Sequence, residues 1–570
     1  MLYYPFHGTM VIMRIVMESK TKSKSKFPSI FKLIPLALLF SFLFVWIVDK
    51  SNPLVIFTDL LGFRRYTVKY ETFDVSFDGT VSEQFKNEIV NSLESIKFNE
   101  KNRFKFVEKK GLVLSTESKD DSKKLASIDL IPVVHRYSLK DSVKLEELKG
   151  KNIYVLNSLF EGFLKEKYGV EVEVLDSYDT LLGRLQENDE RIALLEFEDI
   201  GYESKIVELD GKYFLDNMEG SISFDFYVSN VDAKDEYILD VIRRNVSICK
   251  KSIDEEKIAK VNMSGVVAIS RGLLSKMVAV GSTTYPADVL GEFLADADLT
   301  HVSNEASFAK NCTAGSGMSF CTKDEHIDVL KKSGVDIVEL TGNHNNDYGS
   351  ANNTRTIEMY KALGMDYFGG GLNKEDASKI LYKEVNGTKL AFLGYNYYDT
   401  LYNNVHALAG TSTAGANWYS EEKLKKDIEE AKKNADVVTV SFQFQECYCY
   451  PASDVIYPIC YKPLSNPDQK AVFRKAVDLG ANIVVGTQAH QPQTFESYNG
   501  GMIFYGLGNL FFDQYMWIGT RQGLILSNYF YDGKYIQTKM TPIYMDRNLQ
   551  PRFATKEEGN LLMKLLKNAR

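Results

Sequence analysis

Two turns that each carry a histidine are the parts of this sequence best suited to chemistry. Gly342-Asn343-His344 follows an apolar run at 335–341, and His490 follows an apolar run at 481–485. An imidazole exchanges a proton near neutral pH or binds a metal, and an asparagine supplies a neutral oxygen ligand. Because the carboxyl ends of strands in α/β sheets gather the groups that meet a substrate, we predict that both turns lie at one functional edge.

Polar side chains follow other predicted strands in the same way. Carboxylate, amide and imidazole groups together suit a divalent metal of intermediate hardness, which would polarise a carbonyl or phosphoryl group. Each of them also has an ordinary structural explanation, such as Asn304 capping a turn or Gln443 bonding within a strand. The predicted edge comprises Asn304, Glu305, Asn343, His344, Asp347, Gln443, Glu446, His490, Gln493 and Asn509.

A regular alternation of apolar runs and amphipathic stretches must position these turns. The pattern predicts strands at 266–270, 277–281, 299–303, 335–341, 390–395, 436–442, 482–486 and 502–505. Helices are predicted between them, at 287–295, 325–333, 350–363, 420–434 and 467–479. Repeated strand–helix units of this kind predict a mostly parallel sheet whose loops gather at one edge.

A smaller α/β domain is predicted before this one, over residues 72–264. Strands are predicted at 73–77, 112–115, 128–135 and 152–156, with helices at 82–93 and 178–186. The run 128–135, the segment 145–150 and the run 191–197 together resemble a type 2 periplasmic substrate-binding domain. His135 and Arg136 lie where the cleft of such a domain would open, and arginine suits an anionic ligand. The alternative is an ordinary surface pair.

Composition and charge limit the classes of protein. At 570 residues the chain is too long for one ordinary core, and a net charge of -8 without a basic, aromatic stripe argues against nucleic-acid binding. Six cysteines include Cys312 and Cys321 around a Gly/Ser-rich loop, and a cluster of Cys447, Cys449 and Cys460. Disulfides are favoured over a zinc site, because the spacing lacks two Cys-x-x-Cys pairs.

The N-terminal region predicts a membrane anchor. Residues 33–48 carry no charge, and four lysines between 20 and 26 precede them. These features predict a cytoplasmic tail at 1–30, an uncleaved single-pass transmembrane anchor at 31–49, and an extracytoplasmic location for the bulk of the chain. A buried core helix is the alternative for the apolar run.

From 266 to 555 the sequence resembles the CapA family, which is linked to poly-γ-glutamate capsule synthesis and distantly to calcineurin-like metallophosphoesterases. The resemblance is carried by Ser303-Asn304-Glu305, by Gly342-Asn343-His344 with Asp347, by Gly480 to His490, and by 505–509 with Asp513. It implies a four-layer α/β/β/α metallophosphoesterase-like sandwich, preceded here by the smaller α/β domain and the transmembrane helix.

The departures from this family fall on its ligands. The Gly-Asp that opens the first loop of the family is matched here with Gly281-Ser282-Thr283, and only one histidine remains in the turn 486–490. Residue by residue, the resemblance implies that Asn343 and His490 bind metal and that His344 donates a proton. The chemistry of the side chains adds Glu305 as a ligand and Glu446 as a second catalytic residue. This set would hold one divalent ion, manganese or zinc, or none. The residues predicted to bind substrate are Asn304, Asp347, Gln443, Gln493 and Asn509.

Three functions follow from these features. The first is a membrane-anchored, extracytoplasmic CapA-like hydrolase or transpeptidase that acts with capsule-synthesis partner proteins on an anionic cell-surface polymer such as poly-γ-glutamate. The second is a non-catalytic module with a degenerate metal site that binds the polymer or a partner. The third is a phosphoesterase, which the missing aspartate disfavours.

Overall fold

The computed structural model describes residues 72–98, 101–232, 237–246, 249, 253–313, 315, 317–444 and 468–570. The predicted tail at 1–30, the predicted anchor at 31–49, Glu446, and the cysteines 447, 449 and 460 lie outside these residues. Among the described helices, none combines the length and the apolar character needed to cross a membrane. Phe73–Arg570 form one compact unit.

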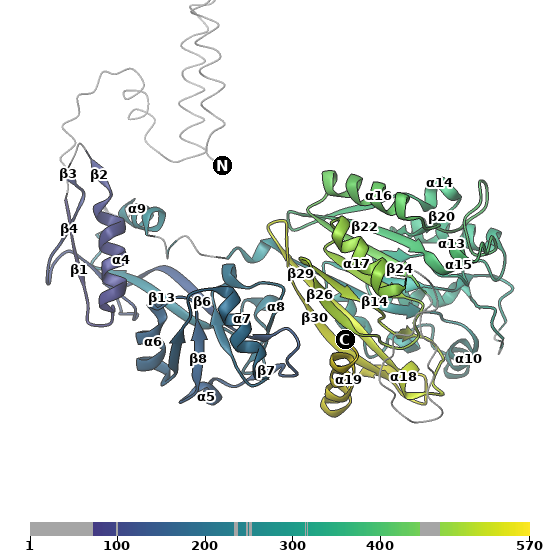
Figure 1. Cartoon of the computed structure of the whole chain (residues 1–570), viewed down its shortest axis with the longest axis horizontal. Coiled ribbons are helices and arrows are strands. Elements are labelled where there is room, and N and C mark those ends of the chain that lie inside the picture. The colour runs from purple at the N-terminus through teal and green to yellow at the C-terminus, as the bar shows by residue number, and fades with distance from the viewer. Residues whose placement is uncertain are drawn as a thin grey trace, which may run out of the picture. The chain divides into compact units, whose positions relative to one another are not determined.

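A nine-stranded sheet organises the first part of this unit (Figure 1), in the order β4-β1-β5-β13-β6-β10-β8-β9 with β11 on β6. The strands are β1 Phe73–Phe77, β4 Phe104–Phe106, β5 Leu112–Ser115, β6 Lys123–His135, β8 Asn152–Val155, β9 Glu171–Val174, β10 Ala193–Leu195, β11 Ser204–Ile206 and β13 Ile222–Ser229. The main helices are α4 Glu83–Glu94, α6 Leu159–Tyr168, α7 Tyr178–Gln186 and α9 Tyr237–Asn245. Shorter elements are β2 Lys97–Phe98, β3 Lys101–Asn102, β7 Ser142–Val143, α5 Leu145–Leu148, β12 Glu208–Leu209 and α8 Phe214–Asn217.

The long strand β6 connects the two halves of this sheet. Its residues 123–130 pair with β13, and its residues 131–135 pair with β10 and β11. The predicted α/β character of this region is confirmed, including the strand at 73–77 and the helix at 178–186.

Two further sheets form the second part. The first has eight strands in the order β19-β18-β15-β14-β29-β30-β31, with β28 on β14, and the second has six in the order β21-β22-β24-β25-β27-β26. The strands of the first sheet are β14 Ile258–Val267, β15 Leu299–Asn304, β18 Ile337–Glu339, β19 Asp366–Phe368, β28 Asn509–Phe511, β29 Gln522–Tyr531, β30 Lys534–Met545 and β31 Pro551–Phe553. Those of the second are β21 Leu381–Val385, β22 Thr388–Asn396, β24 Val437–Gln443, β25 Ile483–Thr487, β26 Phe495–Tyr498 and β27 Gly501–Phe504.

Helices cover the outer faces of these two sheets. The helices of this part are α10 Arg271–Val280, α11 Gly291–Ala295, α12 Asp328–Lys332, α13 Ser350–Ala362, α14 Lys374–Ala377, α15 Tyr397–Leu401, α16 Glu421–Asn434, α17 Gln469–Leu479, α18 Ile518–Arg521 and α19 Lys556–Asn568. Of these, α19 does not lie on an outer face, because its Leu562 and Leu566 pack in one cluster with residues of both sheets. Short strand pairs are β16 Ser307–Phe308 with β17 Cys321–Thr322, and β20 Gly370–Gly371 with β23 Gly415–Ala416.

Three buried apolar clusters define the layers of the second part. One joins α10–α13 to the first sheet, as Leu273 and Ile357 pack with Val302. Another joins α16 and α17 to the second sheet, and Figure 1 shows these helices beside β22 and β24. The third lies between the sheets, where the ring centres of Phe368 and Phe392 are 5.7 Å apart. Alternate strand residues face opposite sides of a sheet, so each sheet contributes to two clusters. The order is therefore helix, sheet, sheet, helix.

Two sequence predictions are wrong in this part. Residues 277–281 do not form a strand, because they lie at the end of α10, where Leu273, Leu274 and Met277 are buried at helical spacing and Gly281 closes the helix at φ 66°. The first strand is instead β14, which starts before the predicted boundary between 264 and 266. The sheets are also less parallel than predicted, since β29, β30 and β31 are antiparallel to their neighbours.

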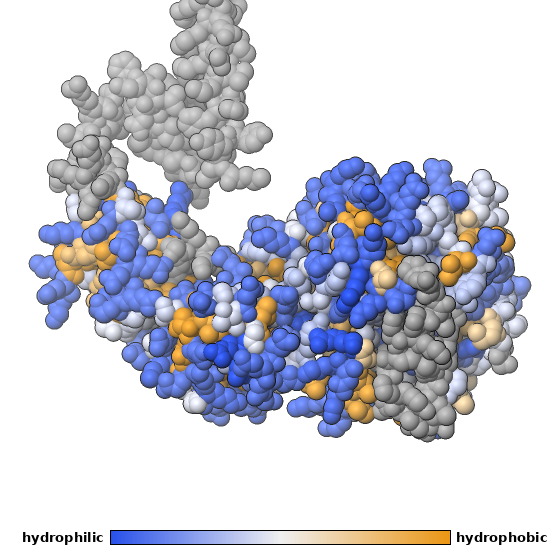
Figure 2. All heavy atoms as spheres, viewed as in Figure 1, coloured by the Kyte–Doolittle hydropathy of each residue, from blue (hydrophilic) through white to orange (hydrophobic). Residues whose placement is uncertain are grey.

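On the face seen in Figure 2, hydrophilic residues cover most of both parts, and hydrophobic ones form small separate groups. The large apolar side chains are concentrated in the buried clusters.

Candidate functional site

The carboxyl ends of several parallel strands meet at one edge of the two sheets. β14, β15 and β18 run parallel in the first sheet, and β22, β24 and β25 run parallel in the second. Direct bonds join the two sheets at this edge. Gln443 Nε2 donates to Asn343 Oδ1 at 3.1 Å, and Asn396 Nδ2 donates to the carbonyl of Thr341 at 3.0 Å. The predicted loops therefore do gather in one place.

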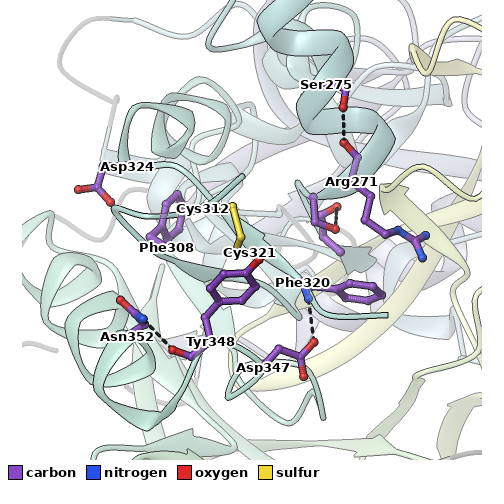
Figure 3. The surroundings of a disulfide bond; sticks show 12 residues. Arg271, Ser275, Phe308, Cys312, Phe320, Cys321, Asp324, Asp347, Tyr348 and Asn352 are labelled. Atoms are coloured by element: carbon purple, nitrogen blue, oxygen red, sulfur yellow. Dashed lines mark hydrogen bonds between the residues drawn. A yellow bond between two sulfur atoms is a disulfide. The ribbon is translucent and has the colours of Figure 1, made fainter. Parts of the chain in front are cut away.

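His344 is held by a carboxylate. Its Nδ1 lies 2.7 Å from Asp347 Oδ2. Asp347 also accepts the backbone N–H of Phe320 at 2.8 Å, and Figure 3 shows this second bond. Burial lowers the pKa of His344, but the hydrogen bond to Asp347 and the charge of Glu305 raise it, and the net shift is upward. Nδ1 donates to the carboxylate, which leaves Nε2 as the group able to give a proton to a substrate. Asp347, predicted to bind substrate, accepts the hydrogen bond that orients His344.

His490 is held by an amide. Its Nδ1 lies 2.9 Å from Asn509 Oδ1, and Asn509 Nδ2 donates to the carbonyls of His490 and Thr520 at 3.1 and 2.9 Å. Because an amide oxygen only accepts, Nδ1 carries the hydrogen and Nε2 carries a lone pair. Burial lowers the pKa of His490 to about 4. The ring is therefore neutral at physiological pH. Asn509, predicted to bind substrate, is engaged within the fold.

Glu305 is a fully buried carboxyl group beside the His344 turn. A Cβ on Gly342 would lie 2.7 Å from Glu305 Cγ, so a glycine is needed for this close approach. Neither carboxylate oxygen has a hydrogen-bond partner among the described residues. Burial raises the pKa of Glu305 to about 7, against the opposing charge of His344. The group is thus poised between its acid and its carboxylate forms near neutral pH.

The predicted amide residues divide into two groups. Gln443 and Asn343 bond to each other at the edge, and Gln443 Nε2 also contacts Gln488 Oε1, while Gln443 Oε1 has no partner among the described residues. Asn304 instead donates to the carbonyl of Ala306 and the hydroxyl of Tyr360, and Gln493 accepts from a glutamine of α17 at 3.2 Å. Both of these side chains are buried, and these bonds serve the fold.

Sequence reasoning missed a charged pair beside both histidine turns. Arg271 Nε donates to Asp513 Oδ1 at 3.1 Å, and the N–H of Gly272 donates to Asp513 Oδ2 at 2.8 Å. The guanidinium lies 4.8 Å from the ring centre of Phe320 and 4.6 Å from that of Phe512. The pair was hidden because strands were predicted on both sides of Arg271. Asp513 formed part of the family resemblance, and it was the one feature of the sequence that pointed to this pair.

Three other predicted positions lie away from this edge. Ser282 and Thr283 follow the far end of α10, where Thr283 Oγ1 donates to Asp328. The glycine at the carboxyl end of the first strand is Gly265, and the residue after it is the buried Val266 rather than an acid. Arg136 is also buried and donates to the carbonyls of Tyr202 and Thr538 at 2.8 and 3.1 Å, so it serves the fold. Within the described residues, no three His, Cys, Asp or Glu side chains gather to hold a metal ion.

The fold and this edge define a mixed α/β protein whose second part carries two histidine turns between two sheets. Residues 260–514 match the family model described as "Bacterial capsule synthesis protein PGA_cap". This region of the chain therefore matches the PGA_cap/CapA family, as the sequence resemblance predicted.

Two curated proteins are similar over this region. The chain is 32% identical over 223 residues to "Capsule biosynthesis protein CapA" of Bacillus anthracis. The aligned region covers 38% of this chain and 50% of that protein. It is 30% identical over 242 residues to "PGA biosynthesis protein CapA" of Bacillus subtilis (strain 168). This aligned region covers 42% of this chain and 59% of that protein. The chain therefore spans about half the length of the curated relatives it matches.

Solved structures show only distant similarity. The calcineurin-like phosphoesterase YfkN from Bacillus subtilis is 13% identical with a TM-score of 0.31, and the match covers 55% of this chain and 99% of that one. A phosphate ABC transporter substrate-binding protein from Clostridium perfringens is 11% identical with a TM-score of 0.20, over 30% of this chain and 92% of that one.

Proposed function

We propose that this chain is a CapA-like protein of capsule biosynthesis that hydrolyses or transfers amide bonds of an anionic polymer such as poly-γ-glutamate. The names of both curated relatives concern capsule or PGA biosynthesis, which supports the choice of pathway and polymer. The observation that carries a catalytic role is the presence, at one edge, of a carboxylate-bound histidine and an amide-bound histidine with opposite pKa shifts.

In this proposal His344 is the proton donor. Asp347 fixes its ring through Nδ1, and Nε2–H gives its proton to the nitrogen that leaves when an amide bond breaks. Such a donor must be protonated near the working pH, and the upward shift in the pKa of His344 serves that need. Phe320 covers one face of the imidazole, with ring centres 3.9 Å apart, and so limits the access of water.

The donor atoms at the edge fit one divalent metal ion in type. The two oxygens of Glu305 and Oε1 of Gln443 are buried without partners among the described residues, and His490 Nε2 carries a lone pair. Glu305, Asn343 and His490 would hold the ion, with Gln443 beside them, and oxygen and imidazole ligands suit manganese or zinc. When bound, the ion would polarise the carbonyl group under attack.

Loss of the proton donor tests this function. Full-length protein is incubated with poly-γ-glutamate, and the length of the polymer is followed by size-exclusion chromatography. We expect that His344→Ala lowers the rate by about 10²- to 10⁴-fold while polymer binding is retained. His406→Ala, at an exposed histidine of the same part, is the matched control and should leave the rate unchanged. An unchanged rate in His344→Ala would overturn the catalytic role.

One observation favours a second function, a polymer-binding module without catalysis. The resemblance matches the family's aspartate with Ser282, which lies beyond the far end of α10, and the last residues of β14, Val266 and Val267, are buried and apolar, so one acidic ligand is missing. In this case the purified wild-type protein would bind poly-γ-glutamate without changing its length, and it would retain no stoichiometric manganese or zinc after dialysis.

We also propose that residues 31–49 anchor the protein in the membrane, with the tail 1–30 in the cytoplasm and the part after residue 50 outside it. The disulfide between Cys312 and Cys321 supports an oxidising compartment. Deletion of 31–49 should move the protein from the membrane fraction to the soluble fraction. In intact protoplasts, the part after residue 50 should be cleaved by added protease. Protection of that part would refute the proposed orientation.

A further inference from the structure

The disulfide between Cys312 and Cys321 closes a segment that reaches the candidate site. Both cysteines are buried, and their sulfur atoms pack with Leu274 of α10 and Ala309, with Tyr348 against the same cluster. Figure 3 shows the disulfide beside Tyr348, close to Asp347 and Phe320. Tyr348 directly follows Asp347 in the chain, so the disulfide lies next to the turn that carries His344.

Phe320, which directly precedes Cys321, touches both members of the His344–Asp347 pair. Its ring is 1% exposed and stacks on the imidazole of His344, with ring centres 3.9 Å apart and planes inclined by 27°. Its backbone N–H donates to Asp347 Oδ2 at 2.8 Å, the same oxygen that bonds His344. A displacement of this one residue would therefore remove a contact from the histidine and a hydrogen bond from its partner.

Phe320 is also packed from the other side. Its ring lies 5.3 Å from that of Phe512, edge to face, and 4.8 Å from the guanidinium of Arg271. Arg271 is itself fixed by Asp513. These contacts complete a layered arrangement of charged and aromatic groups around His344, in which Phe320 is the central member.

We propose that Phe320, held by the adjacent Cys312–Cys321 disulfide, is a positioning residue for the His344–Asp347 pair, so that the geometry of the pair depends on an oxidised loop. A dithiol would reverse this state. It would transfer two electrons and two protons to the disulfide, break the S–S bond, leave thiols at Cys312 and Cys321, and itself become a cyclic disulfide. The effect of disulfide reduction on polymer turnover rests on the proposed function, whereas its effect on the position of the His344 ring does not.

The backbone offers a competing restraint on Phe320. Cys321 pairs with Ser307, and Thr322 pairs with Phe308, in the short parallel pair formed by β16 and β17. The N–H of Ala309 also donates to the carbonyl of Thr322 at 2.9 Å. Isolated strand pairs are marginal in water, so we expect that two paired residues do not hold the segment once the disulfide is broken. If they do hold it, the proposal fails.

Nuclear magnetic resonance of the full-length protein with labelled histidine separates these cases. The stacked ring of Phe320 shifts the ring protons of His344, and the signal of His344 is identified as the one among seven that His344→Ala removes. We expect that treatment with dithiothreitol moves this signal to the position found in the variant Cys312→Ser/Cys321→Ser, on which the dithiol has no further effect. An unmoved His344 signal in the reduced protein and in the double variant would overturn the proposal.

Two variants of Phe320 test its role while the disulfide stays intact, so that the result does not depend on unfolding of the reduced loop. Phe320→Leu retains the disulfide but loses the stacked ring, and Phe320→Tyr restores the ring. We expect Phe320→Leu to move the His344 signal and to lower polymer turnover by at least about 10-fold, and Phe320→Tyr to restore both. If the wild-type protein shows no turnover, the proposed function fails while the His344 signal still decides this proposal. Equal signals in the two variants would overturn it.

Discussion

His344 and His490 both follow buried strands, β18 and β25, and both bond through Nδ1, but one partner is a carboxylate and the other an amide. Burial lowers the pKa of each ring. For His344 the bond to Asp347 and the charge of Glu305 reverse that effect, whereas for His490 the bond to Asn509 does not. His344 therefore binds its proton more tightly than a free imidazole does, whereas His490 is neutral and its Nε2 carries a lone pair. The residue that bonds Nδ1, rather than the histidine or the strand before it, sets this difference.

The replacement Asp347→Asn makes the two turns alike and has the largest expected effect. Asparagine keeps an oxygen for the N–H of Phe320 but removes the negative charge, so the pKa of His344 should fall. We expect turnover to drop by about 10²- to 10³-fold at neutral pH, since less of the proton donor is charged. The pH–rate profile checks this.

In the wild-type protein, the rate should fall as the pH rises through the pKa of His344. In Asp347→Asn this fall should move to lower pH. His406→Ala serves as the control, because it removes an exposed histidine of the same part and should leave the position of the fall unchanged. A fall at the same pH in Asp347→Asn would mean that the carboxylate does not set the charge of His344.

The gathering of the two turns could be predicted from the sequence, because it depends on local patterns. The strand predicted at 299–303 and the helix predicted at 420–434 agree with β15 and α16 to within about one residue. Parallel strands end at a shared edge, so polar residues after such strands are brought together whatever the details of packing.

The partners of the site residues could not be predicted in the same way. Asp347 lies three residues after His344, but only the shape of the turn shows that it faces the imidazole rather than a substrate. The bond from Asn304 to Tyr360 spans 56 positions, and that from Arg271 to Asp513 spans 242. Such contacts depend on tertiary packing. The apolar run in α10 was itself ambiguous, because short apolar runs suit both helices and strands.

Glu305→Gln tests the carboxyl group that distinguishes the surroundings of His344. The pKa of Glu305 rises from 4.5 to about 7 on folding, so the folded protein retains the proton between these values and loses stability as pH rises through this window. Above pH 7 the cost approaches about 3 kcal/mol. We expect Glu305→Gln to be more stable than wild type by about this amount at pH 8 and equal to it at pH 4, in urea unfolding.

A chelator and added manganese sharpen this test. A bound cation would favour the ionised carboxylate and reduce the loss of stability between pH 4.5 and 7. The difference between wild type and Glu305→Gln should therefore be largest with the chelator. If the variant is less stable than wild type at pH 8 even with the chelator, burial of the ionised Glu305 carboxylate does not lower the unfolding free energy, and this prediction is wrong.

His490→Gln should change stability on the acid side instead. The pKa of His490 falls from 6.5 to about 4 on folding, so the unfolded chain binds the proton first, and the protein loses stability as pH falls from 6.5 towards 4. At pH 5 this loss is about 2 kcal/mol. Glutamine does not titrate, so the unfolding free energy of the variant should fall less between pH 7.5 and pH 5. An equal fall in both proteins would show that His490 titrates normally.

Phe512→Leu has the smallest expected effect and touches both turns at once. The ring of Phe512 lies 5.2 Å from that of His490 and 5.3 Å from that of Phe320, which stacks on His344. Loss of these aromatic contacts should lower the unfolding free energy by about 1 kcal/mol and move the magnetic resonance signals of both histidines. Phe308→Leu is the matched control, because Phe308 is equally buried but packs on Tyr360. It should cost a similar amount and leave the two histidine signals in place, whereas movement of only one signal in Phe512→Leu would show that the turns are not linked through this ring.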